Sequence, residues 1–126
     1  MLEIFIISFG FKYGLPRDAD LVFDVRFLKN PYYEPHLAKQ TGLDADVARF
    51  VRKDSGFVDF SNKLKDMLSL LFPRYSAEGK SYLTIAIGCT GGRHRSVFLA
   101  DELALWASKV GERVHLYHRD LENQPK

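Results

Sequence analysis

The chain has 126 residues, 46% of them hydrophobic, which suits one domain over residues 1–126 with a sizeable core. Its 18 Lys and Arg residues face 16 Asp and Glu residues, and a net charge of +2 is too small to indicate nucleic-acid binding by composition alone. No run of about 18 apolar residues occurs, so no membrane partner is expected. The single cysteine, Cys89, excludes an intrachain disulfide and favours a cytoplasmic protein.

The first quarter of the sequence predicts two strands and a loop between them. Residues 2–8 are almost continuously apolar, as is typical of a central strand. The loop at 9–16 contains two glycines and a proline. Its Lys12 and Tyr13 are candidate ligand contacts, and aromatic packing in a surface loop is the alternative. A second strand is expected at 21–25.

Asp24 and Arg26 stand at the end of this second strand, and two interpretations of them stay open. In the first, they form a plain ion pair on one face of an extended segment, which contributes little if it is exposed. In the second, Arg26 binds a phosphate and Asp24 binds a hydroxyl or amine of a substrate.

The middle of the chain predicts helices. The segment at 31–41 is expected to be irregular, and it either faces a ligand or packs against the rest of the protein. A short helix is expected around 44–50. Asp54 or Ser55 caps a longer helix that Pro73 ends. One stripe of this helix is expected in the core: Phe57, Phe60, Leu64, Met67 or Leu68, and Leu71.

The second half of the chain predicts a strand, a helix and a strand. Residues 83–87 form the first strand, helical spacing of apolar residues begins at Val97, and Gly111 caps that helix. The last strand covers 113–118, and a frayed tail is expected at 122–126. This order predicts an α/β fold: a single-domain layered sheet, largely parallel, with flanking helices.

The stretch LTIAIGCTGGRHRS at 83–96 contains the strongest functional signal. Glycines after a buried strand let the backbone turn sharply and approach a ligand. The amides and dipole of the following helix N-terminus favour an anion, and three cationic side chains lie beside it. We therefore expect a phosphate site at the carboxyl end of this strand. Its candidate ligand residues are Thr90, Gly91, Gly92, His94, Arg95 and Ser96.

An enzymatic alternative lies within the same stretch. Residues 89–96 satisfy C-x-x-G-x-x-R-[ST], which resembles the signature loop of cysteine-dependent tyrosine phosphatases. There Cys89 would attack phosphorus and Arg95 would hold the phosphate. However, Gly88 stands where those enzymes usually carry histidine, and no general acid is identifiable. A buried structural cysteine is the other interpretation, and the sequence favours binding over catalysis.

No cofactor or metal is expected. His115 and His118 lie three apart on an expected strand and so on opposite faces, and no zinc pattern or nucleotide-binding P-loop occurs. Small RNA is a further candidate partner, since Arg93, Arg113 and Arg119 would contact phosphates if they converge at one sheet edge. Separate solvated surfaces are the alternative.

Short motifs spread over nearly the entire chain resemble the C-terminal domain of the RNase adapter protein RapZ family. The matching residues include Ser8-Phe-Gly-Phe-Lys12, Val22-Phe-Asp-Val-Arg-Phe-Leu28, Thr41-Gly-Leu-Asp44, Ala86-Ile-Gly-Cys-Thr-Gly-Gly92 and His94-Arg-Ser-Val97.

The resemblance implies a domain that senses glucosamine-6-phosphate and binds small regulatory RNA, guiding an endoribonuclease. By position, Thr90, Gly91, Gly92, His94 and Arg95 would hold the sugar phosphate, and the loop at Lys12 and Tyr13 would close over it. The family usually carries a preceding P-loop domain, so nucleotide-dependent control is either absent or supplied by a separate P-loop protein as partner. A homo-oligomer stays open as an alternative.

Overall fold

The computed structural model describes residues 2–122 and contains a four-stranded sheet in which every strand pair is parallel. The strand order is β2-β3-β1-β4, so the first strand of the chain is central, as its apolar sequence predicts. The strands are β1 (Glu3–Gly10), β2 (Leu21–Asp24), β3 (Tyr82–Cys89) and β4 (Arg113–His118). The predicted α/β fold with a parallel sheet is confirmed.

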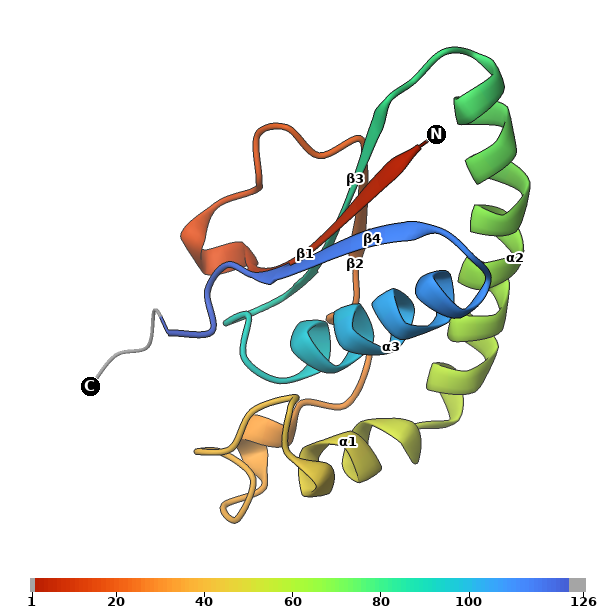
Figure 1. Ribbon diagram of the computed structural model, residues 1–126. Coiled ribbons are helices and arrows are strands. Elements are labelled where there is room, and N and C mark those ends of the chain that lie inside the picture. Colours follow the sequence, from red (N-terminus) through yellow and green to blue (C-terminus); the bar gives the residue numbers. More distant parts are fainter. Residues whose placement is uncertain (1, 123–126) are drawn as a thin grey trace.

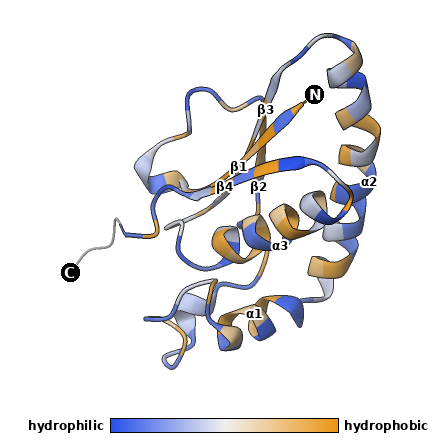
Figure 2. Ribbon diagram, in the orientation of Figure 1, coloured by the Kyte–Doolittle hydropathy of each residue, from blue (hydrophilic) through white to orange (hydrophobic). Residues whose placement is uncertain are grey.

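Three α-helices lie on one side of the sheet, and the β1–β2 connection lies on the other (Figure 1). They are α1 (Ala45–Arg52), α2 (Ser55–Ala77) and α3 (Arg95–Lys109). Hydrophobic and hydrophilic residues alternate along α1 and α2 in Figure 2, because one side of each helix packs inward. Two short 3-10 helices complete the fold: η1 (Phe11–Tyr13) after β1 and η2 (Pro31–Tyr33) after β2.

The structure corrects the predicted end of α2. The helix continues through Pro73 and ends at Ala77. Gly79, just after the C-cap residue Glu78, has a φ of 94°, in the left-handed region. Lys80 N donates to Tyr75 O at 3.0 Å, which satisfies one of the last carbonyls. Packing of Phe72 against Trp106 of α3, with ring centroids 6.1 Å apart, holds the turn that contains the proline.

The buried stripe of α2 agrees with the expected one at Phe57, Leu64 and Leu68. Its buried residues include Leu68 and Phe72, whereas Met67 is 39% exposed and Leu71 and Phe60 are only partly buried. The cap is Asp54, which accepts from Gly56 N at 2.9 Å. Part of the predicted C-terminal tail, from residue 123 on, lies outside the described residues.

The carboxyl ends of the strands meet at one edge of the sheet, because all strands run in the same direction. Gly10 at the end of β1 pairs with Cys89 at the end of β3, and Ser8 pairs with His118 at the end of β4. The segment between β3 and α3 starts at this edge. The fold therefore puts the glycine-rich loop where ligands of parallel α/β sheets bind.

Candidate functional site

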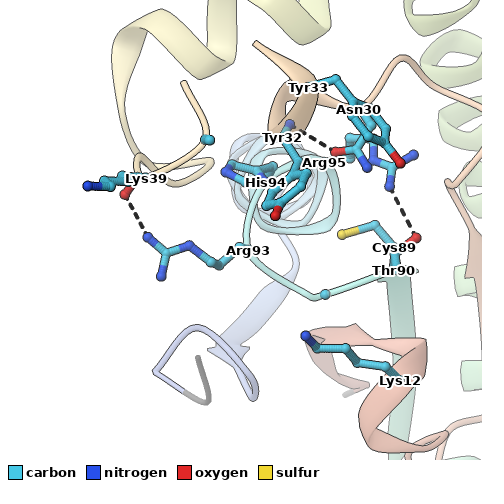
Figure 3. Close-up of a pocket in the computed structure, with 12 residues that line it drawn as sticks. Lys12, Asn30, Tyr32, Tyr33, Lys39, Cys89, Thr90, Arg93, His94 and Arg95 are labelled. Atoms are coloured by element: carbon cyan, nitrogen blue, oxygen red, sulfur yellow. Dashed lines mark hydrogen bonds between the residues drawn. The ribbon is translucent and has the colours of Figure 1, made fainter. Parts of the chain in front are cut away.

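A pocket of about 560 Å³ lies at this edge, between the β3–α3 loop and the segment after η2. One wall consists of Cys89, Thr90 and Gly91 at the end of β3, followed by Arg93, His94 and Arg95. Figure 3 shows the side chains of this wall together with those of the opposite wall. The loop and the first residue of α3 thus line one continuous cavity, as the sequence predicts for the strand-to-helix turn.

Two glycines at the carboxyl edge let the loop pack against the end of β1. Gly92 has φ of 75°, and a Cβ there would lie 2.5 Å from Gly10 N. A Cβ on Gly10 would lie 2.4 Å from Gly91 C. Gly91, in contrast, faces open space and lines the pocket. The loop is therefore fixed from behind, and its free side faces the cavity.

Arg95 is the most informative side chain of the pocket. It is 4% exposed, and its Nη1 donates at 2.9 Å to the carbonyls of Arg26 and of Leu28. Its Nη2 lies 3.4 Å from Thr90 Oγ1, and its Nε has no partner among the described residues. No carboxylate pairs with it in the described part of the chain. Asp24 is near enough for its charge to interact with Arg95, but it is paired with Arg26. A buried guanidinium without an ion-pair partner is costly, and an anion in the pocket would offset that cost.

His94 is the N-cap of α3 and is 6% exposed. Burial lowers the pKa of His94 below its ordinary value of 6.5, and the charge of Arg93 acts in the same direction. The carbonyls of Gln40, Ala38 and Leu37 oppose this shift. The ring is therefore neutral at neutral pH. Its Nε2 is buried and has no hydrogen-bond partner within residues 2–122.

Cys89 is 2% exposed, and its Sγ lies 3.1 Å from Ser96 Oγ. Cys89 lines the pocket, whereas Ser96 is fully buried behind it. The hydroxyl of Ser96 therefore contacts the thiol and is not itself a pocket-lining group. Neither Asp nor Glu occurs among the described pocket-lining residues, so none of them supplies a carboxylic acid to protonate a leaving group.

The opposite wall comes from η2 and the segment that follows it. Asn30, Tyr32 and Tyr33 line the pocket, and Tyr32 and Tyr33 are 62% and 79% exposed. Further along, Lys39 lines the cavity, and its carbonyl accepts from Arg93 Nη2 at 2.7 Å. The sequence indicated that residues 31–41 face a ligand or pack, but it did not single out these side chains. The adjacent tyrosines Tyr32 and Tyr33 beside Pro31 were the local sequence signal for a ligand-facing wall.

Lys12 lines the pocket from η1, and its amide donates to Thr90 O at 3.2 Å. Tyr13 lies outside the lining, with its ring 5.1 Å from Lys12 Nζ. Gly92 is likewise behind the pocket wall.

Asp24 and Arg26 also lie outside the pocket lining. Arg26 donates to both carboxylate oxygens of Asp24, and both side chains are 47% exposed. Hydrogen bonds from Arg26 hold the pKa of Asp24 below its ordinary value, and the charge of Arg95 adds to this effect. The Arg26 guanidinium lies 3.9 Å from the centroid of the Phe11 ring. The arrangement matches the ion-pair interpretation of the two residues.

The three arginines proposed for RNA do not gather on one patch. Arg93 lines the pocket, whereas Arg113 begins β4 at the opposite edge of the sheet and lies 3.7 Å from a carboxylate oxygen of Glu3. Arg119 donates to Gly14 O and to Asp120, and its side chain is 25% exposed. Arg93 alone of the three lines the pocket.

No group of three or more His, Cys, Asp or Glu side chains within the described part of the chain is placed to hold a metal ion. Among the helices of residues 2–122, none combines the length and apolar character needed to cross a membrane.

Known proteins are similar to this chain along nearly its whole length. The sequence model described as the RapZ C-terminal domain matches residues 2–122. A nucleotide-binding protein of Rhodospirillum rubrum is 59% identical over 125 residues, which cover 99% of this chain and 39% of that protein. One from Bacillus cytotoxicus is 55% identical over 119 residues, covering 94% and 40%. This chain spans about two fifths of these relatives, and it belongs to the RapZ C-terminal domain family.

Proposed function

We propose that this chain is a phosphate-recognising module that binds a hexosamine phosphate such as glucosamine-6-phosphate and acts as a metabolite sensor. The observation that carries the proposal is Arg95, a buried cation that lines a pocket and has only neutral oxygen partners. The names of the relatives as nucleotide-binding proteins fit a phosphorylated ligand. The identity of the sugar rests on the family resemblance.

In this proposal the phosphate lies against Thr90 and Gly91, between Lys12 and Arg95. Loop amides at the N-terminus of α3, which is 15 residues long, favour an anion there. Tyr32 and Tyr33 at the pocket mouth offer flat apolar rings to the faces of a sugar. His94 lines the same pocket.

Isothermal titration calorimetry tests the proposal with inorganic phosphate, glucosamine and glucosamine-6-phosphate. We expect Lys12→Ala and Arg95→Lys to weaken binding of glucosamine-6-phosphate roughly tenfold, the usual effect of losing a charge-assisted hydrogen bond. Lys109→Ala removes an exposed lysine at the far end of α3 and is the matched control. Equal weak binding of inorganic phosphate and glucosamine-6-phosphate would remove the sugar from the proposal.

Small regulatory RNA is the second candidate ligand. The pocket mouth carries exposed Lys12, Lys39, Tyr32 and Tyr33, and such side chains contact phosphates and stack on bases. The resemblance suggests a separate P-loop protein as partner, and the single cysteine favours a cytoplasmic location. Self-association is an open alternative in this proposal. Gel-shift titration with small RNA, in the presence and absence of glucosamine-6-phosphate, tests whether the two ligands compete for the mouth.

A further inference from the structure

We infer that Asp54, the N-cap residue of α2, is a positioning residue of the phosphate site: its carboxylate holds the segment whose carbonyls fix the guanidinium of Arg95. This inference rests on the proposed function, because it takes Arg95 to be the cation that meets the phosphate. It deepens that function by naming a residue outside the pocket lining on which ligand affinity depends.

The first step is how the guanidinium of Arg95 is held. Its Nη1 donates at 2.9 Å to the carbonyls of Arg26 and Leu28, whereas its Nη2 lies 3.4 Å from Thr90 Oγ1, near the upper limit for a hydrogen bond. Neither carbonyl belongs to a regular element, because β2 ends at residue 24 and η2 begins at residue 31. The place of the guanidinium in the pocket therefore depends on what fixes residues 26–28.

The second step is that this segment is anchored on both sides of the two carbonyls. Before them, Val25 N donates to Gly88 O at 2.9 Å, which continues the pairing of β2 with β3. After them, Lys29 N donates to Asp54 Oδ2 at 2.8 Å, across 25 residues of sequence. Without the carboxylate, the end of the segment that carries the carbonyl of Leu28 would lose this anchor, and the guanidinium would lose its fixed acceptor.

The third step is that the two carboxylate oxygens of Asp54 have separate roles. Oδ1 accepts from Gly56 N at 2.9 Å and caps α2, whereas Oδ2 accepts from Lys29 N. These hydrogen bonds, from Lys29 and then from Gly56, hold the pKa of Asp54 below its ordinary value, so both oxygens are acceptors at neutral pH. Serine is also a favoured N-cap, but it has one side-chain oxygen. Asp54→Ser therefore keeps a cap for α2 and removes the acceptor of the Lys29 amide.

Asp20 provides a matched control away from the pocket. Its carboxylate accepts from Thr84 N at 2.8 Å, so it likewise joins two distant parts of the chain through one backbone amide, and it also pairs with Lys80. Thr84 lies near the start of β3, whereas the pocket lies at the end of that strand, and neither Asp20 nor Thr84 lines the pocket. Asp20→Ser should therefore destabilise the protein at least as much as Asp54→Ser while leaving Arg95 in place.

The experiment is calorimetry with glucosamine-6-phosphate and inorganic phosphate, at a temperature at which thermal unfolding shows every variant to be folded. We expect Asp54→Ser to weaken binding of glucosamine-6-phosphate about fivefold and Asp20→Ser to change it less than about twofold. The double variant Asp54→Ser with Arg95→Lys should bind within about twofold of Arg95→Lys alone, because Asp54 acts through the guanidinium that Arg95→Lys removes.

The outcomes separate this inference from the proposed function. Full affinity in Asp54→Ser, with the ligand still bound by the unchanged protein, overturns the positioning role and leaves the phosphate site standing. Equal weakening in Asp54→Ser and Asp20→Ser also overturns it, because lower stability would then account for the loss. An additive loss in the double variant would show that Asp54 does not act through Arg95. If the unchanged protein binds neither compound, the proposed function and the positioning role both fail.

Discussion

The carboxylate of Asp120 accepts a hydrogen bond from the amide of Gly10 at 2.8 Å, across 110 residues of sequence. Asp120 is 1% exposed and also accepts from Arg119 Nε and Nη2. Gly10 in turn lies directly behind the loop, against Gly91 and Gly92. Asp120 therefore fixes the end of β1, and through it the back of the pocket.

The first prediction follows from this contact. Asp120→Ala leaves the Gly10 amide without its acceptor and leaves Arg119 with only the carbonyl of Gly14 as an acceptor among the described residues. We therefore expect the free energy of unfolding to fall by roughly 2–4 kcal/mol. Urea denaturation measures the change. Asp66→Ala, which removes an exposed carboxylate of α2, should change stability by less than about 0.5 kcal/mol. Equal stability of the two variants would show that the Gly10 contact is unimportant.

The second prediction compares two adjacent glycines. Gly92→Ala should destabilise the fold by about 2 kcal/mol or more, because its φ is 75° and the new Cβ would meet the Gly10 backbone. Gly91→Ala meets nothing within 4 Å and should leave the melting temperature unchanged. Since Gly91 lines the pocket, we expect its added methyl group to weaken phosphate binding. Calorimetry and thermal unfolding on both variants check the pair, and unaltered affinity in Gly91→Ala would argue against a phosphate at the loop.

The third prediction concerns pH. Burial lowers the pKa of His94, so the unfolded chain binds its proton more readily than the folded chain does. His94 therefore lowers stability as pH falls below the ordinary value of 6.5, and its contribution levels off only below the lowered pKa of the folded state. Urea denaturation at several pH values between about 7.5 and 5 should show a weaker decline in His94→Gln. His36→Gln, at an exposed histidine, should retain the full decline.

The fourth prediction tests the phosphatase alternative. Although Cys89, Arg95 and Ser96 have the spacing of a phosphatase loop, no described pocket residue carries a carboxylic acid. We therefore expect no turnover of a chromogenic aryl phosphate. Turnover that disappears in Cys89→Ser, while that variant remains folded, would establish the enzymatic function instead.

The fifth prediction separates the three arginines proposed for RNA. Arg93→Ala should weaken RNA binding and reduce its salt dependence, because Arg93 lines the pocket near exposed lysines. Arg113→Ala should have little effect, since Arg113 lies at the other edge of the sheet beside Glu3. Arg119→Ala should lower the melting temperature, because Arg119 donates hydrogen bonds to Gly14 and Asp120. Any loss of RNA binding in this variant is then expected to follow from its lower stability. Gel shifts at increasing salt, together with melting temperatures, distinguish these effects. Equal losses of RNA affinity in Arg93→Ala and Arg113→Ala would argue against an RNA-binding surface around the pocket mouth.

Local sequence order was enough to predict the strand, loop and helix around the pocket. The β3–α3 loop joins adjacent elements, so its glycines and Arg95 reveal the turn without knowledge of distant contacts. The capping of α2 by Asp54 and the positive φ of Gly111 after α3 are equally local and are confirmed.

Long-range packing decided what the sequence could not predict. Lys39 reaches the pocket because its carbonyl binds Arg93, 54 residues further along the chain. Asp24 and Arg26 lie outside the pocket lining and pair with each other, with Arg26 against the Phe11 ring. The proline in α2 was expected to end the helix, but the contact of Phe72 with Trp106 supports the following turn. Each of these outcomes depends on residues far from the position itself.

Gly42, in the segment before α1, lies directly against the turn before α3. Its amide donates to Arg93 O at 2.9 Å, and a Cβ there would lie 2.3 Å from His94 O. Because the backbone at Gly42 contacts the backbone at Arg93 and His94 directly, we expect the segment before α1 and the turn before α3 to move together. A ligand that binds in the cavity and makes this turn more rigid should therefore slow amide hydrogen exchange around residue 42. Exchange at this position would then report on binding in the cavity.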